Sequence, residues 1–301
     1  MRLPLKSKAP ITSLAISPDG KWLAVGQDDK DDLPALTIWD TVAWKWVADV
    51  EKDRIRSLSF SRDSNSLAYA TRNKVGFFNL GAMQLKDSVT APDVEYVCYG
   101  RTRDLLLMAG RTVRVLNAPE NKELWTYDDY TADFYNAFPA AAVFYQNDSS
   151  VMITGIGDTK FSVFDLQTGK MTAQFPGGVK RAYGMVTDNT EKYLWVKSRP
   201  PRIANFFWKL DTMTSHLEKD FNEENAISYA ICFHPSSRFF AAGNRVGFLG
   251  IHDNKTGEMG FHERIHKGTI EAMTFSSDGS LLISGDIRGK VLVTDMTKHI
   301  S

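Results

Sequence analysis

Short apolar segments alternate with polar turns along the whole chain, and one pattern recurs seven times. Each unit has an alternating segment, a polar turn, a second apolar segment, a tight turn and a third segment that ends in an aromatic-plus-polar doublet or a variant of it. Short runs with a period of two are typical of half-buried β-strands, and the turn residues between them favour hairpins. The pattern therefore predicts an all-β chain built from repeats of one antiparallel unit.

Two sets of positions mark the repeat. The polar turns are Ser17–Gly20, Ser61–Ser64, Arg101–Asp104, Gln146–Ser149, Thr187–Thr190, His234–Ser237 and Ser276–Gly279. The doublets are Trp39-Asp40, Phe78-Asn79, Leu116-Asn117, Phe164-Asp165, Trp208-Lys209, His252-Asp253 and Thr294-Asp295. Successive doublets lie 38 to 48 residues apart. This spacing is close to the roughly 40–45 residues of one blade of a β-propeller.

With SPDG turns followed by strands that end in TIWD, VFDL or GIHD, the chain resembles the WD-repeat family over its whole length. The strict Trp-Asp pair occurs only at Trp39-Asp40, and a His-x-Gly motif only at His266–Gly268. The resemblance implies a single seven-bladed β-propeller with four-stranded antiparallel blades, forming one domain over residues 1–301. The His-x-Gly motif belongs to a hydrogen-bond network that often holds the blades of the family, and the other repeats lack it. We therefore expect apolar packing between blades to provide most of the stability.

The last repeat predicts how the ring closes. It has three strands, at about residues 269–276, 281–285 and 290–295, and only six residues follow them. The N-terminal segment of residues 2–6 alternates Leu3 and Leu5 on one face, and Pro4 suits an edge strand. The resemblance implies that this N-terminal strand joins the last blade, at about residues 269–301, as its fourth strand.

Charge and cysteine content narrow the classes of function. The 36 basic and 36 acidic side chains cancel, so no global field attracts nucleic acid or an anionic membrane. The N-terminus lacks the apolar stretch of a secretory signal, and no apolar run is long enough to span a membrane. Cys98 and Cys232 lie in separate apolar segments without a CxxC spacing, as packing thiols would. We expect a soluble, intracellular and cytoplasmic protein without a membrane partner.

One segment formally matches a zinc-protease motif. Residues 262–266 read HERIH, but that chemistry needs a helix, in which both histidines share one face. The repeat instead predicts an outer strand followed by a loop, where the backbones of His262 and His266 would lie about 13 Å apart. No Walker loop, GxGxxG motif or arguable Ser-His-Asp set occurs. We therefore predict no metal site, no cofactor and no catalytic residues.

Local charge gives the candidate binding residues. In a propeller, the loops between second and third strands share one face, and six of the seven predicted loops carry a cation there, one of them Lys160. The candidates for partner binding are the basic residues Arg72, Lys74, Arg111, Arg199, Arg202, Arg245, Arg288 and Lys290, the acidic residues Asp28, Asp29, Asp31 and Asp32 of the first such loop, and Tyr130, Phe134 and Tyr135. The three aromatic residues belong to a long connection at residues 126–139. The alternative explanation for the charges is that charged residues are common in turns, and the alternative for the aromatic residues is that the connection folds onto its own blade.

The function predicted from these features is a non-catalytic scaffold or complex subunit that binds a protein or peptide partner on a propeller face. A nucleic-acid-binding propeller that uses the basic rim is the first alternative, and steep salt dependence would reveal it. An enzyme with a site at the channel mouth is the second, since one fold hosts many functions. The oligomeric state does not follow from these features.

Overall fold

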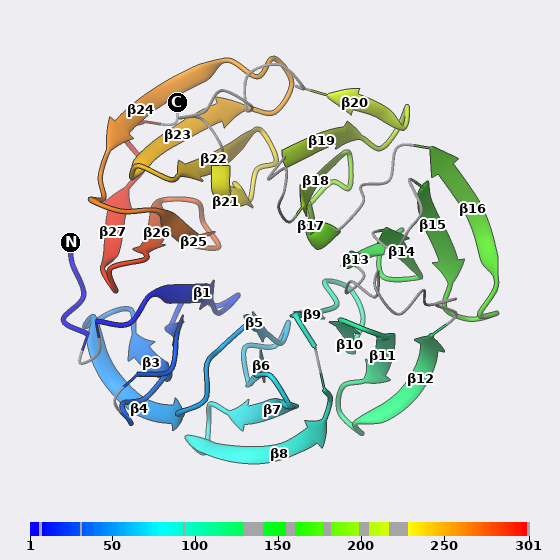
Figure 1. Ribbon diagram of the computed structural model, residues 1–301, viewed down its shortest axis with the longest axis horizontal. Helices are drawn as coiled ribbons and strands as arrows, with labels where there is room; N and C mark the ends of the chain where they lie inside the picture. Colours follow the sequence, from blue (N-terminus) through cyan, green and yellow to red (C-terminus); the bar gives the residue numbers. More distant parts are fainter. Residues whose placement is uncertain are drawn as a thin grey trace.

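The described elements form a ring of seven β-sheets around a central opening, as the sequence predicts (Figure 1). The computed structural model describes residues 1–5, 8–30, 32–92, 94–128, 141–154, 160–176, 182–198, 205–216 and 228–299. In these residues every regular element is a β-strand, and no helix could cross a membrane. Each sheet is antiparallel and forms one blade, with its first strand nearest the centre (Figure 1).

The strands follow one another blade by blade along the chain. Blades 1 and 2 contain β1 (Ile11–Ile16), β2 (Trp22–Gln27), β3 (Leu36–Asp40), β4 (Lys45–Glu51), β5 (Ser57–Phe60), β6 (Ser66–Ala70), β7 (Lys74–Asn79) and β8 (Gln84–Thr90). Blades 3 and 4 contain β9 (Tyr96–Tyr99), β10 (Leu105–Ala109), β11 (Val113–Asn117), β12 (Lys122–Tyr127), β13 (Ala141–Tyr145), β14 (Ser150–Thr154), β15 (Lys160–Asp165) and β16 (Met171–Pro176). Blades 5 to 7 contain β17 (Ala182–Thr187), β18 (Tyr193–Ser198), β19 (Asn205–Lys209), β20 (Thr214–His216), β21 (Ser228–Phe233), β22 (Phe239–Asn244), β23 (Phe248–Asp253), β24 (Met259–Arg264), β25 (Ile270–Phe275), β26 (Leu281–Asp286) and β27 (Val291–Asp295).

Every blade has the same strand order, so equivalent turns lie on one face of the ring. We call the face with the second-to-third-strand turns and the links between blades the upper face. The lower face carries the first-to-second and third-to-fourth-strand turns. All seven doublets end a third strand, as predicted; β3, for example, ends at Asp40 and β27 at Asp295.

The first-to-second-strand turns contact one another around the lower face. Several contain the predicted left-handed residues, such as Gly20 with φ of 74° and Ser64 with φ of 61°. The amide of Asp19 in blade 1 donates to Ser64 Oγ of blade 2 at 3.0 Å. In blades 3 and 4, Thr102 Oγ1 donates to Asp148 Oδ2 at 2.9 Å. These contacts link neighbouring blades through polar groups that the sequence marked only as turn formers.

The N-terminus closes the ring against the last blade, over a shorter segment than predicted. The terminal ammonium of Met1 donates to the carbonyl of Val293 at 2.6 Å, and Leu3 N donates to the carbonyl of Val291 at 3.1 Å. The pairing ends there, because the amide of Leu5 turns back to the carbonyl of Leu3 at 3.1 Å. The expected strand at residues 2–6 is thus a short bridged segment at its beginning, while Lys6 lies outside the described residues.

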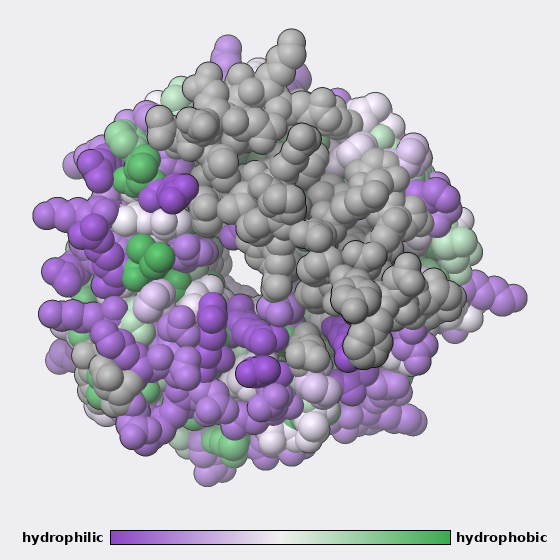
Figure 2. Space-filling view, in the orientation of Figure 1, coloured by the Kyte–Doolittle hydropathy of each residue, from purple (hydrophilic) through white to green (hydrophobic). Residues whose placement is uncertain are grey.

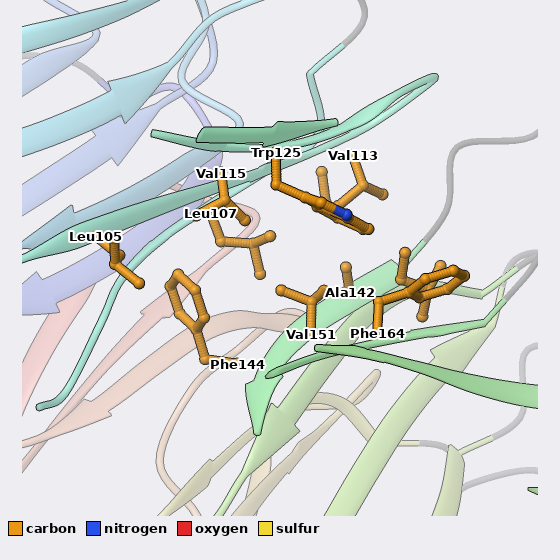
Figure 3. Close-up of a cluster of buried hydrophobic side chains, with 11 residues drawn as sticks. Leu105, Leu107, Val113, Val115, Trp125, Ala142, Phe144, Val151 and Phe164 are labelled. Atoms are coloured by element: carbon orange, nitrogen blue, oxygen red, sulfur yellow. The ribbon is translucent and has the colours of Figure 1, made fainter. Parts of the chain in front are cut away.

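Apolar side chains fill the spaces between blades. Figure 3 shows one such cluster, in which Trp125 and its neighbours on blade 3 face Phe144 and Phe164 of blade 4. Tyr127 was expected in a connecting loop, but it ends β12 and stacks on Trp125 with 6.3 Å between ring centroids. The physical reason is that a strand alternates its side chains, which turns Tyr127 to the same packed face as Trp125.

Candidate functional site

The basic candidates on the upper face fall into two groups. Arg72, Arg111, Arg245 and Arg288 are exposed, and none of these side chains forms an ion pair with any residue that the structure describes. Lys74, in contrast, lies 2.7 Å from Glu51 Oε2. The exposed arginines are therefore available for a partner, whereas Lys74 of blade 2 is partly neutralised by Glu51 of blade 1.

The acidic loop of blade 1 also lies on this face. Asp28 is half-buried and contacts Arg54 at 3.4 Å, while Asp29 and Asp32 are exposed. Burial raises the pKa of Asp28; Arg54 opposes this effect and the carboxyl group of Asp29 adds to it. The loop thus presents negative charge beside the channel.

Six candidates fall outside the described residues, and the structure does not locate them. These are Arg199, Arg202, Asp31, Tyr130, Phe134 and Tyr135. Lys290, the remaining basic candidate, is half-buried next to the turn that carries Arg288.

Blades 6 and 7 combine exposed cations with exposed aliphatic groups. Val246 is 36% exposed beside Arg245, and Ile287 is 46% exposed beside Arg288. Figure 2 views the upper face, where apolar groups interrupt the hydrophilic surface over these blades, at the left of the central opening. An arginine next to an exposed aliphatic group is typical of a protein-binding surface, because the core of an interface needs apolar contact as well as charge.

A cavity of about 590 Å³ opens at the upper end of the channel, where blades 7, 1, 2 and 3 meet. Its charged lining includes Arg56, whose Nη1 lies 3.1 Å from Glu95 Oε1. Arg54 and Glu271 line the same cavity. The sequence analysis missed these residues, although several of them stand just before or at the start of an innermost strand, where side chains reach the channel.

Glu271 and Lys197 extend the charged lining into the channel. Glu271 is the second residue of β25 and is half-buried; burial raises the pKa of its carboxyl group, which Lys197 and Arg54 oppose. Lys197 on β18 is 9% exposed, and burial lowers its pKa to about 8 against the attraction of Glu271. A second space of about 400 Å³ continues from these two residues to Arg101 on the lower side.

The HERIH segment forms an outer strand and a following loop, as predicted. His262 lies on β24, is exposed and stacks on Phe248 at 4.7 Å. His266 follows the strand and is 2% exposed. No group of three or more potential metal ligands occurs in the described part of the chain.

His266 belongs to a buried polar network. Its Nδ1 donates to Asp286 Oδ2 at 2.9 Å, and its Nε2 lies 2.8 Å from Ser284 Oγ. The sequence predicted that the second strand of this blade ends at about residue 285, whereas β26 extends to Asp286. Asp286 is 1% exposed, and its carboxylate also accepts hydrogen bonds from the backbone amides of Arg288 and Lys290. Burial alone would raise the pKa of Asp286, but the hydrogen bonds from His266 and from the amides of Lys290 and Arg288 lower it.

This network has the distances of a catalytic Ser-His-Asp set but not its accessibility. Ser284 is fully buried, so its hydroxyl does not face either cavity at the channel. A nucleophile must reach a bound substrate, and these side chains instead connect two strands and the preceding link inside blade 7. The arrangement stabilises the blade.

Comparisons with known proteins agree with this architecture. The family model described as "WD domain, G-beta repeat" matches residues 4–31 and 261–295, which meet at the ring closure. A WD repeat-containing protein SL1-17 from Schistosoma mansoni is 29% identical over 89 residues. That alignment covers 30% of this chain and 29% of the relative's length. The chain is a seven-bladed β-propeller that is similar to WD repeats over these two segments.

WD-repeat propellers generally mediate protein–protein interactions and are generally non-catalytic. The polar network of His266, Ser284 and Asp286 lies in blade 7, within the second matched segment. Apolar clusters fill the spaces between other neighbouring blades.

Proposed function

We propose that this WD-repeat propeller is a non-catalytic scaffold that binds a protein or peptide partner on its upper face. The observation that carries the proposal is the set of exposed arginines on second-to-third-strand turns, next to exposed aliphatic groups on blades 6 and 7. Arginine is favoured at interface hot spots because its planar guanidinium donates several hydrogen bonds at once.

The charge distribution favours an acidic partner segment. Arg245 and Arg288 would attract carboxylates, and Val246 and Ile287 would bury apolar or aromatic side chains beside them. The acidic loop of blade 1 would repel the same segment in a wrong register and so orient it. A lone exposed charge contributes at most about 1 kcal/mol, so the arginines act only where the partner removes them from water.

The charged groups of the channel do not support an enzyme. Arg54 and Arg56 are held in ion pairs, and the Ser-His-Asp set is sealed inside blade 7. Burial raises the pKa of Cys232, and that of Cys98, so neither thiol is activated as a nucleophile. These features are consistent with a rigid scaffold that acts through its surface.

The test compares charge reversal on the two faces. The upper-face variant carries Arg111→Glu, Arg245→Glu and Arg288→Glu; its matched control carries Lys170→Glu, Lys192→Glu and Lys255→Glu on the lower face, where all three lysines are exposed. Each variant is used to capture partners from the native cell, with quantitative mass spectrometry as the measurement. We expect the upper-face variant to lose a stoichiometric protein partner without a change in melting temperature, and the control to retain it.

Three outcomes would contradict the proposal. Loss of the partner with the lower-face variant alone would place binding on the other face. Recovery of nucleic acid, with binding that weakens steeply with salt, would favour the nucleic-acid alternative. Turnover of a small molecule by the purified chain, with no stoichiometric partner, would favour an enzyme.

We also propose a cytoplasmic location, since both cysteines are free and a reducing compartment keeps them so. Imaging of a fluorescent fusion together with cell fractionation tests this, and recovery from an oxidising compartment would contradict it.

A further inference from the structure

We propose that the cavity at the upper channel mouth receives one basic side chain, lysine or arginine, of the partner segment, with Glu271 as its counter-ion. This inference rests on the proposed function and adds the chemistry of one partner residue. The partner segment would then be mainly acidic, with a single basic residue at the channel mouth.

The argument starts from the charges around the cavity. Asp28 is 3.4 Å from Arg54, and Glu95 is 3.1 Å from Arg56, so these four residues form two ion pairs between neighbouring blades. Among the described residues of the lining, Glu271 is the remaining charged one. No ion pair or hydrogen bond of its carboxylate is found with the residues that the structure describes. The part of the lining that the structure describes therefore has one negative charge in excess, on Glu271.

The walls of the cavity suit the aliphatic part of a basic side chain. Ile287 is exposed at the rim and the half-buried Pro10 also lines the cavity, while Ile11 and Ile55 are fully buried just behind this surface. A lysine or arginine buries its methylene groups against apolar surface and keeps its charge at a polar site. A volume of about 590 Å³ also accommodates the backbone on either side of such a residue.

Burial of Glu271 makes an incoming cation favourable. A half-buried carboxylate loses hydration, and a cation that contacts it restores favourable interactions in a medium where charges are weakly screened. Lys197 attracts Glu271 from inside the channel and so competes with the incoming cation. The competition gives a specific signature, because removal of the Lys197 charge should strengthen binding.

The experiment measures binding of two blocked tripeptides to the purified full chain. One probe is acetyl-Ala-Lys-Ala-amide, and the matched probe replaces lysine with norleucine, which has no charge. Isoleucine-methyl NMR reports on the cavity, since Ile287 is exposed at its rim and Ile11 and Ile55 lie just behind its surface. We expect saturable shifts of these methyl signals with the lysine probe and at least about tenfold weaker binding of the norleucine probe.

Three variants of the chain complete the test. Glu271→Gln keeps the shape of the side chain and should lower the affinity for the lysine probe at least about tenfold. Lys197→Met should raise that affinity about threefold. The matched control is Glu120→Gln, which removes an exposed carboxylate at a distant turn and should change nothing. Melting temperatures check that each variant is folded.

The outcomes separate this inference from the proposed function. The inference would be overturned if the two probes bound equally well, or if Glu271→Gln bound the lysine probe as tightly as the wild type. It would also be overturned if putrescine bound more tightly than the lysine probe, because the cavity would then be assigned to a small polyamine. The upper-face arginine reversal should leave the lysine probe bound while it releases the protein partner. Loss of the partner without any lysine binding would therefore refute only the cation site, and lysine binding without loss of the partner would refute only the proposed face.

Discussion

Leu3 contributes a buried apolar side chain to the closure of the ring, and Leu3→Ala tests how much it stabilises the fold. Leu3 is 2% exposed and packs in the cluster that joins blades 7 and 1, with Ile11, Trp39 and Val291. Truncation of a buried leucine generally costs about 2–5 kcal/mol. We expect the lower part of this range, about 2–3 kcal/mol, because a terminal segment can relax into the space left behind.

The assay is thermal unfolding followed by circular dichroism or calorimetry. For a chain of this length, about 2 °C of melting temperature corresponds to 1 kcal/mol, so we expect a decrease of about 4–6 °C. The matched control is Leu85→Ala, since Leu85 is 51% exposed on the outer strand β8 and should change the melting temperature by about 1 °C at most. Equal melting temperatures for the two variants would refute the role of the N-terminal segment. Deletion of residues 1–5 should destabilise the ring further and promote association, because it leaves the edge of β27 unpaired.

Three further predictions concern blade 7 and its neighbours. Gly279→Ala should destabilise the chain by about 2 kcal/mol in urea unfolding, because Gly279 has φ of 76° and an added Cβ would overlap the ring of His234 in the preceding blade. Gly260→Ala, with nothing within 4 Å, should be neutral. Asp286→Asn should cost about 2 kcal/mol at neutral pH. The pKa of Asp286 is lowered in the folded state, so the stabilisation from its carboxylate is present above the ordinary value of 3.8 and is lost as the pH falls through the folded value. The difference in unfolding free energy between wild type and variant should therefore shrink in acid. A difference that stays constant with pH would contradict this role of Asp286. Elemental analysis should find no stoichiometric zinc, since His266 is committed to Asp286 and His262 is exposed on a strand, and one equivalent lost on His262→Ala would show the geometry to be wrong.

The repeat could be predicted because its signals are local. The polar turns and the doublets located the strands of blade 7 to within one residue, and all seven third strands end where the doublets predict. Alternation of apolar residues and turn-forming side chains acts over a few positions of the chain, so a single sequence contains this information. The seven copies of the pattern then gave the number of blades, and the interval between doublets matched the length of one blade.

The sequence by itself also located the turns that carry Arg72, Arg111, Arg245 and Arg288, and therefore the face on which they lie. It did not reveal that Lys74 is neutralised by Glu51, which belongs to the previous blade. Contacts of this kind depend on how two blades are rotated against each other, and side-chain packing decides that rotation.

Only the tertiary structure decided the chemistry of the channel mouth. Glu271 comes from the last blade, Arg54 and Glu95 from connections more than 170 residues earlier, and they meet because closure of the ring places β25 beside β1. The same closure buries Leu3 against Val291. Local patterns determine the strands and turns. Burial and the distances between segments far apart in the chain determine the ion pairs, the excess charge of Glu271 and the buried network of blade 7. These distances exist only once the ring is closed.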